Sequence, residues 1–188
     1  MKLINTPFEG MYIIQPRVFS DSRGYFFESY STAKFKELGL DIDFVQDNES
    51  FSEYGVIRGL HYQLAPYAQA KLVRAVKGSI LDVGVDVRKN SPTYGKHFAY
   101  ELNDVTKEML LIPRGFAHGF SVLSEIAIVN YKCDNLYKNS AERGVSFNDL
   151  TLAIDWKVDP AKVKVSEKDV VLPVLAEIDV NFEYGEKY

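Results

Sequence analysis

Short strand-like runs, separated by turn residues, recur along most of the chain and constrain its fold more than any other feature. The runs are rich in β-branched and aromatic residues, and glycine, proline, asparagine, aspartate or serine often stands between them. Aromatic residues make up 13% of the chain, which suits pleated, half-buried surfaces. Many short strands with few helices are typical of a β-sandwich or barrel. The expected strands are residues 11–15, 25–29, 44–46, 56–62, 72–76, 80–87, 98–102, 109–112, 119–123 and 127–132.

The clearest turn signal lies between two of these runs. Residues 72–76 and 80–87 flank Lys77-Gly78-Ser79. The glycine supplies the backbone freedom that a tight turn needs. We therefore predict that the two runs pair with each other as a β-hairpin.

Only one segment has a convincing helical pattern. Ser31 can cap its amino end, Phe35 and Leu38 share a face, and Gly39 can close its carboxyl end. A weaker helical signal follows Pro160, where Asp159 can cap a first turn. Any helices are therefore expected to be few, short and peripheral, and the polar residues 183–188 are expected to fray.

Composition and charge exclude several classes of protein. The chain has 188 residues without a linker or repeat, so residues 1–188 are expected to form one domain. Its 22 Lys and Arg against 26 Asp and Glu give a net charge of -4, which argues against nucleic acid or an anionic membrane as a partner. The single cysteine, Cys133, excludes an internal disulfide framework. The chain contains no run of about 18 apolar residues, and its first residues lack the pattern of a secretion signal, so we expect a cytoplasmic protein.

Two of the three histidines lie in unusual sequence contexts. His118 ends a Pro-x-Gly-x-x-His string that begins at Pro113 and resembles the second motif of the cupin superfamily, whose fold is a small β-barrel or jelly roll. Metal-binding cupins also carry a His-x-His pair with a downstream Glu, whereas here His61 is followed by Tyr62 and Gln63. Catalytic metal sites generally need three protein ligands. We therefore predict an all-β, cupin-type jelly roll that binds no metal; the alternative is a site completed by carboxylates distant in the sequence.

A more specific resemblance extends over nearly the whole chain. It is carried by several motifs in a fixed order: SRGYFFES, FVQDN, RGLHYQ, AQAKLVRAVKGSILDVGVDVR, IPRGFAHGFSVLSE, YKCDNLY, AERGVSFND, IDW and SEKD. These strings resemble the dTDP-4-dehydrorhamnose 3,5-epimerase family. The resemblance implies a cofactor-free epimerase of dTDP-rhamnose biosynthesis that acts on a nucleotide-linked 4-keto-6-deoxy sugar. The C4 ketone acidifies the hydrogens on C3 and C5, so one base and one acid can invert either carbon through an enolate.

The same resemblance assigns the catalytic roles. It implies that His61 is the base, that Asp169 orients it, that Tyr131 is the acid on the opposite face and that Lys71 stabilises the enolate oxygen. Each assignment has a plainer alternative. His61 can be a core histidine bonded to backbone, Tyr131 an ordinary strand aromatic and Lys71 a solvated lysine at the start of a strand.

The resemblance also implies a set of substrate-binding residues. Arg23 and Arg58 suit the diphosphate, and Tyr137 suits stacking on the base or sugar. As alternatives, Arg23 is a surface turn residue, and Glu28 and Arg58 form a structural ion pair. The complete expected set is Arg23, Glu28, Gln46, Asp47, Asn48, Arg58, His118, Tyr137, Glu142 and Lys168.

Several functions remain open at this point. The same acid and base can serve a 3-epimerase or a 5-epimerase, or an enzyme for a GDP-linked or heptose substrate. The segments 64–69 and 135–138 also differ from the sequence that is commoner in the family. A metal-dependent cupin oxygenase and a non-catalytic sugar-binding cupin are the alternatives from other classes. The resemblance also implies a homodimer in which strands or amino-terminal segments are shared between subunits.

Overall fold

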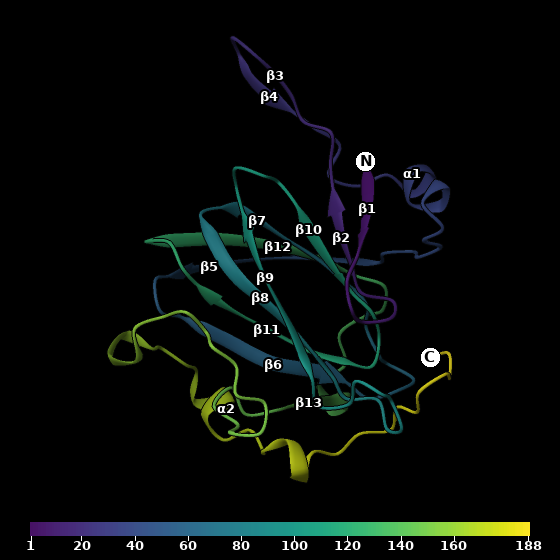
Figure 1. Cartoon of the computed structure of the whole chain (residues 1–188), viewed down its shortest axis with the longest axis vertical. Coiled ribbons are helices and arrows are strands. Elements are labelled where there is room, and N and C mark those ends of the chain that lie inside the picture. Colours follow the sequence, from purple (N-terminus) through teal and green to yellow (C-terminus); the bar gives the residue numbers. More distant parts are fainter.

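Two antiparallel sheets face each other in the computed structural model, which describes residues 1–188 (Figure 1). The six-stranded sheet has the order β1-β2-β10-β7-β12-β5, and the five-stranded sheet has the order β13-β6-β11-β8-β9. The strands are β1 Lys2–Asn5, β2 Tyr12–Gln15, β3 Phe19–Asp21, β4 Gly24–Phe26, β5 Gln46–Glu53, β6 Ile57–Gln63, β7 Lys71–Lys77, β8 Ser79–Asp86, β9 His97–Asn103, β10 Met109–Ile112, β11 Phe116–Val122, β12 Ile126–Cys133 and β13 Glu142–Gly144. The helices are α1 Thr32–Glu37 and α2 Glu167–Val170, with short 3₁₀ turns at Asn139–Ala141, Pro160–Lys162 and Leu175–Glu177.

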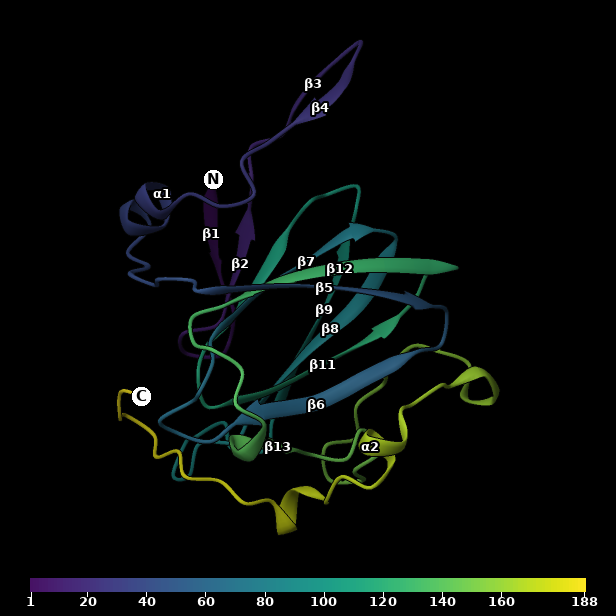
Figure 2. The same cartoon turned by 180° about the vertical axis from the view of Figure 1, so that it is seen from behind.

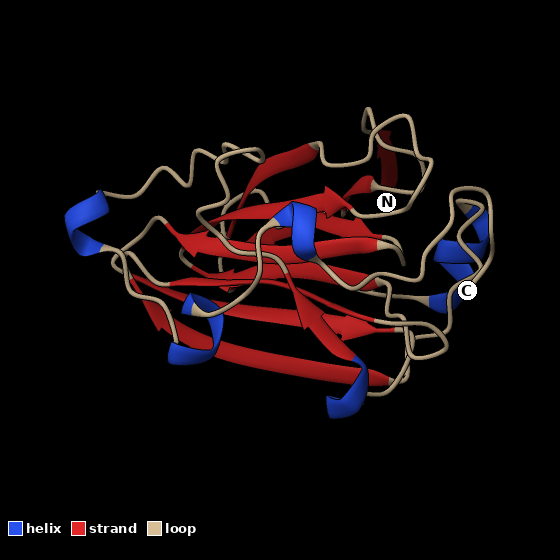
Figure 3. Ribbon diagram, turned by 90° about the horizontal axis from the view of Figure 1, so that it is seen from below, coloured by secondary structure: helices blue, strands red, loops and turns tan.

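The main core lies between the two sheets, which Figure 3 shows as stacked layers. Val73 and Val129 of the six-stranded sheet and Ile80 and Phe120 of the five-stranded sheet belong to one cluster of buried apolar side chains. Strands alternate their side chains between two faces, so each sheet contributes every second residue to this core. The predicted all-β, cupin-like jelly-roll fold is confirmed.

The predicted hairpin between residues 72–76 and 80–87 is wrong in its pairing. The turn forms at Gly78, but β7 pairs with β10 and β12, whereas β8 pairs with β9 and β11 in the other sheet. The turn is therefore a corner between sheets. Glycine is required there because φ is +74° and an added Cβ would lie 2.1 Å from the carbonyl oxygen of Ile126.

The outer faces of the two sheets are covered differently. The predicted helix at 31–39 is confirmed as α1, whose first turn is capped by Ser31 and whose fully buried Phe35 belongs to a cluster on the six-stranded sheet with Ile14 and Leu72. The five-stranded sheet is covered by the carboxyl-terminal segment through a cluster that includes Trp156, Leu175 and Phe182.

This carboxyl-terminal segment also contains the capped turn that the sequence predicts. Asp159 accepts a hydrogen bond from the backbone N–H of Ala161 at the start of a 3₁₀ turn. Within the segment 183–188, whose fraying stays a prediction, the ring of Tyr188 packs 5.0 Å from that of Phe182. Neither α1 nor α2 is long and apolar enough to cross a membrane.

A two-stranded hairpin of β3 and β4 projects away from both sheets, as Figures 1 and 2 show from opposite sides. We call residues 19–26 the arm. Its rings are exposed, with Phe19 51%, Tyr25 58% and Phe26 67% accessible to solvent. Lys107 contacts the arm through the hydroxyl group of Tyr25, 3.0 Å away. Of the expected strand at 25–29, only Tyr25 and Phe26 belong to β4. Both rings are exposed to solvent in the single chain.

Candidate active site

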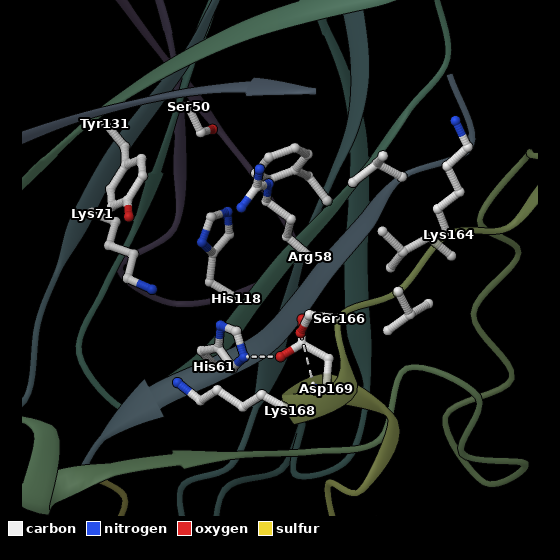
Figure 4. A pocket seen from close by; sticks show the side chains of 14 residues that line it. Ser50, Arg58, His61, Lys71, His118, Tyr131, Lys164, Ser166, Lys168 and Asp169 are labelled. Carbon is white, nitrogen blue, oxygen red and sulfur yellow. Dashed lines mark hydrogen bonds and ion pairs between the residues drawn. The ribbon is translucent and has the colours of Figure 1, made fainter. Parts of the chain in front are cut away.

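A cavity of about 490 Å³ opens between the two sheets and is lined by polar side chains from both (Figure 4). A smaller cavity of about 100 Å³ shares His61, Lys71 and Tyr131 with it. The smaller cavity is lined further by Gln46, Asn48, Gln63, Gln69, Tyr137 and Glu142. The two cavities therefore meet at three of the four residues for which the sequence implies a catalytic role.

A β-bulge in β6 brings Arg58 and His61 into the same cavity. Strict alternation would place these residues on opposite faces of the strand. The register between β6 and β11 shifts, because His61 is opposite His118 whereas Arg58 is opposite Phe120. Gly59 occupies the bulge with φ at +111°, and a Cβ there would lie 2.6 Å from the carbonyl oxygen of His118. Only glycine fits this approach of β6 to β11.

His61 is held by Asp169. The Nε2 atom of His61 lies 2.7 Å from Oδ1 of Asp169, and the dashed line in Figure 4 marks this contact. The other carboxylate oxygen accepts the backbone N–H of Gly59 at 3.1 Å, and Ser166 caps the short helix α2 that carries Asp169. A carboxylate accepts but does not donate, so Nε2 carries the proton and Nδ1 is left free as a base. His61 is therefore not bonded to backbone as the plainer alternative expected.

The environment of Asp169 keeps it ionised. Burial alone would raise its pKa, but the hydrogen bonds from His61 and from the Gly59 backbone outweigh burial, and the pKa of Asp169 lies below its ordinary value. The side chain of Asp169 is only 4% exposed. The charged partner that a histidine base requires is thus in place.

Lys71 and Tyr131 line the same cavity from β7 and β12 of the other sheet. Their side chains lie close together, with Nζ of Lys71 6.0 Å from the centre of the Tyr131 ring. Burial lowers the pKa of Lys71, against longer-range attraction from Asp82 and Glu142. Burial also raises the pKa of Tyr131, so its phenol keeps its proton at neutral pH. The cavity thus holds a protonated phenol beside a desolvated lysine side chain.

His118 forms a second contact between a histidine and an aspartate. Its Nε2 atom lies 2.8 Å from Oδ1 of Asp82, a β8 residue with no solvent exposure. Burial lowers the pKa of His118, although Asp82 opposes this effect. Sequence reasoning missed Asp82. A lone acid within the apolar run Ile80-Leu81-Asp82-Val83 was the available signal, because carboxylates are almost never fully buried unless paired.

Arg58 is oriented by residues of β5 that the sequence did not single out. Its Nε atom donates to the hydroxyl of Ser52 at 3.0 Å, and Nη2 donates to the carbonyl oxygen of Phe51 at 3.2 Å. Neighbouring Ser50 lines the cavity, and its buried hydroxyl has no hydrogen-bond partner. These bonds fix the guanidinium group at the wall of the cavity.

Five more of the expected binding residues form a connected group. Tyr137 donates its hydroxyl hydrogen to Glu142 at 2.6 Å, and Nζ of Lys168 lies 2.5 Å from the same carboxylate. The Tyr137 backbone N–H donates to Gln46, which in turn donates to Asn48 at 3.0 Å. The smaller cavity is therefore bordered by a half-exposed ring with hydrogen-bonding groups beside it.

Three expected binding residues do not reach either cavity within this chain. Asp47 faces the outside of the sheet, where it pairs with Lys132 at 2.7 Å. Arg23 lies in the arm, is 88% exposed in its side chain and bonds to Asp21. Glu28 pairs with Lys34, so the alternative ion pair between Glu28 and Arg58 is not formed within this chain. No group of three or more His, Cys, Asp or Glu side chains is arranged to hold a metal ion.

Comparison with known proteins places this chain in a family. The sequence profile described as dTDP-4-dehydrorhamnose 3,5-epimerase matches residues 5–177. The chain is 48% identical over 171 residues to the dTDP-4-dehydrorhamnose 3,5-epimerase of Shigella flexneri, covering 90% of this chain and 93% of that protein.

Solved structures agree in sequence and in fold. The dTDP-4-dehydrorhamnose 3,5-epimerase of Elizabethkingia anophelis NUHP1 is 54% identical with a TM-score of 0.88, and the match covers 93% of this chain and 96% of that one. A dTDP-6-deoxy-D-glucose-3,5-epimerase of Legionella pneumophila, solved in complex with dTDP-4-keto-L-rhamnose, is 42% identical with a TM-score of 0.91 and coverage of 95% and 94%. The chain therefore belongs to the dTDP-4-dehydrorhamnose 3,5-epimerase family.

Proposed function

We propose that this protein is an epimerase that inverts C3 and C5 of dTDP-4-dehydro-6-deoxy-D-glucose and so forms dTDP-4-dehydro-L-rhamnose. The observation that carries the proposal is the pairing of His61 with Asp169 in a cavity that also holds Lys71 and Tyr131. These groups supply the base, the acid and the cation that this chemistry needs. Membership of the family supports the substrate.

The first step is removal of a proton next to the ketone. Nδ1 of His61 takes the proton from C3 or C5, and the electron pair of that C–H bond moves into the ring as the C4 oxygen becomes an enolate. The imidazolium that forms is stabilised by the charged carboxylate of Asp169. The ammonium group of Lys71 stabilises the enolate oxygen, and a preorganised charge of this kind is worth about 10²- to 10³-fold in rate.

The second step returns a proton from the opposite face. Tyr131 donates its phenolic proton to the same carbon, and the electrons on the enolate oxygen re-form the ketone. His61 then loses its proton and Tyr131 regains one through exchange with solvent before the other carbon reacts. No net oxidation occurs, so the balance of the reaction requires no hydride carrier.

The remaining cavity residues are proposed to bind the nucleotide sugar. Arg58 suits the diphosphate, since its guanidinium group is already fixed by Ser52 and Phe51. The exposed ring of Tyr137 suits stacking on the base. The other residues proposed to contact the substrate are Gln46, Asn48, His118, Glu142 and Lys168.

We further propose that the protein works as a homodimer and that the arm of each subunit, together with Glu28 just after it, completes the cavity of its partner. Arg23 and Glu28 lie outside the cavity of their own chain, and the arm exposes Phe19, Tyr25 and Phe26. A partner surface that covers these rings would explain both features, because exposed aromatic clusters mark interfaces. The location in the cytoplasm, the single-domain organisation of residues 1–188 and the absence of nucleic-acid and membrane partners remain predictions.

Deuterium exchange tests the proposal directly. Incubation in D₂O with dTDP- and GDP-linked 4-keto-6-deoxy sugars, followed by NMR, should show deuterium at both C3 and C5 of the dTDP sugar with inversion at both carbons. Exchange at one carbon only would identify a 3- or 5-epimerase, and preference for the GDP sugar would change the substrate. Binding without exchange would indicate a sugar-binding protein. Loss of activity after dialysis against a chelator would indicate a metal-dependent enzyme.

A further inference from the structure

Only two buried side-chain polar atoms in the chain have no hydrogen-bond partner, and one of them is Oδ2 of Asp82. Asp82 has no solvent exposure, and its other oxygen contacts Nε2 of His118. A buried carboxylate with an unpaired oxygen destabilises a fold, because its charge loses hydration without full compensation. This cost to stability suggests that Asp82 serves the chemistry of the neighbouring cavity.

The contact between Asp82 and His118 repeats the arrangement at His61. The two histidines are directly opposite each other on β11 and β6, and both line the larger cavity. Each contacts an aspartate through Nε2, at 2.8 Å for His118 and at 2.7 Å for His61. Since the carboxylate can only accept, Nε2 of His118 carries the proton, and Nδ1 is the ring nitrogen left for the cavity.

We propose that Asp82 is a positioning residue of the reaction: it fixes His118 in the tautomer whose unprotonated Nδ1 accepts a hydrogen bond from a hydroxyl group of the sugar. The inference rests on the proposed function, because it requires a sugar in the cavity. The buried, low-pKa environment of His118 supports it, since a neutral imidazole has two tautomers and a doubly protonated ring has no acceptor.

The charge of Asp82 is needed to make the choice of tautomer. A carboxylate can satisfy only the Nε2–H form of His118. An asparagine amide can accept from Nε2–H or donate to a bare Nε2, so it satisfies either form. Asp82→Asn keeps the size of the side chain and removes the preference. In the other tautomer of His118, Nδ1 would point its N–H at the sugar and could not accept a hydrogen bond from the hydroxyl group.

Asp86 provides a matched control on the same strand. It is equally without solvent exposure, but it binds Arg88, Ser91 and Thr93 and does not line either cavity. We expect Asp82→Asn to lower kcat/KM about ten- to a hundredfold, the range that follows from loss of orientation at a reacting centre. Asp86→Asn should lower the melting temperature and leave kcat/KM unchanged below that temperature.

A double-mutant cycle separates positioning from a merely structural role. If Asp82 acts through His118, Asp82→Asn should cause no further loss of kcat/KM in a His118→Ala background. A loss of the same size in both backgrounds would overturn the proposal, as would unchanged kcat/KM in the single variant.

Nitrogen NMR of the unsubstituted protein tests the tautomer even if Asp82→Asn does not fold. The imidazole of His118, assigned by comparison with His118→Ala, should show a protonated Nε2 and an unprotonated Nδ1. A protonated Nδ1 would overturn the proposal. Failure of the proposed function would appear separately, as a wild-type protein that shows the expected tautomer but exchanges no substrate hydrogen.

Discussion

The Nε2 atom of His61 lies 2.7 Å from Oδ1 of Asp169, although 108 positions separate the two residues in the sequence. The contact joins strand β6 to the carboxyl-terminal segment that covers the outside of its sheet. The base of the proposed reaction is therefore oriented by a segment outside the two sheets.

Replacing His61 by asparagine should abolish proton exchange while the substrate still binds. Removal of a general base costs about 10²- to 10⁴-fold in rate, and exchange at both C3 and C5 should fall together because one base serves both carbons. The measurement is deuterium incorporation by NMR, with dTDP affinity by calorimetry. His97→Asn is the control, since His97 lies on β9 and lines neither cavity. Normal exchange in His61→Asn would exclude His61 as the base.

Tyr131→Phe should separate proton removal from inversion. Burial raises the pKa of Tyr131, so the phenol is protonated at neutral pH and can donate. Without it, His61 can still remove and return a proton on its own face, so exchange with retention should persist while epimerised product falls about 10²- to 10⁴-fold. Tyr100→Phe is the control, because the Tyr100 hydroxyl bonds to Glu108 away from the cavity. Unchanged epimerisation by Tyr131→Phe would rule out this acid.

Lys71→Met should make the protein more stable at neutral pH and nearly inactive. Burial lowers the pKa of Lys71, so the folded state binds this proton less tightly than the unfolded state does. The free energy of unfolding of the wild-type protein is therefore lowered, and the whole of this loss is present at pH values below the pKa of Lys71 in the folded state. This loss of stability becomes smaller as the pH rises toward the ordinary pKa of lysine. The free energy of unfolding of the wild-type protein should therefore approach that of the variant over that alkaline range.

Urea unfolding at neutral and alkaline pH, combined with kcat, checks this prediction. The loss in kcat should be about 10²- to 10³-fold, as for other preorganised groups that stabilise an oxyanion. Lys77→Met, at the exposed end of the same strand, should change neither quantity appreciably. A variant that is active, or one that is less stable at neutral pH, would contradict the role and the burial cost respectively.

Two inactive variants should restore activity to each other if the arm completes the partner's cavity. A chain with His61→Asn keeps Arg23 and Glu28, and a chain with Arg23→Ala and Glu28→Ala keeps a working base. Random pairing on co-expression gives hybrid dimers with one complete cavity, or about a quarter of wild-type activity. Combining the three substitutions in one chain and pairing it with His61→Asn gives the control, which should stay inactive. Activity no greater than the sum of the two separate variants would argue against shared cavities.

The sequence predicted the class of fold and most of the cavity residues, but it did not predict strand β5 beyond Gln46. The inward-facing residues of this strand are polar: Gln46, Asn48, Ser50 and Ser52. Alternation of apolar with polar residues is the signal for a half-buried strand, and a strand that faces a polar cavity lacks it. Because the cavity is polar, the strand that forms one of its walls lacks the apolar pattern of a strand. The sequence therefore did not indicate this strand or its serines near Arg58.

The corner at Gly78 shows a second limit. A short turn between two apolar runs has the same sequence pattern whether the runs pair or enter facing sheets, because each strand needs one buried face in both cases. The pairing is decided by β10 and β12 on one side and by β9 and β11 on the other, and these strands lie far away in the sequence. Arg23 and Glu28, which we propose to serve a neighbouring chain, show a third limit, since no pattern within one chain indicates which residues do so.

The proposed base and acid stand on different layers of the sandwich, with His61 on the five-stranded sheet and Tyr131 on the six-stranded sheet. An enolate is planar at the reacting carbon, and inversion requires that the proton leave from one side and arrive from the other. Two facing sheets, about 10 Å apart, can hold the base on one side of the sugar ring and the acid on the other. The apolar core that sets their spacing thereby influences stereochemical outcome. A core substitution that moves the layers apart should favour return of the proton to the side it left, so configuration would be retained although the fold persists.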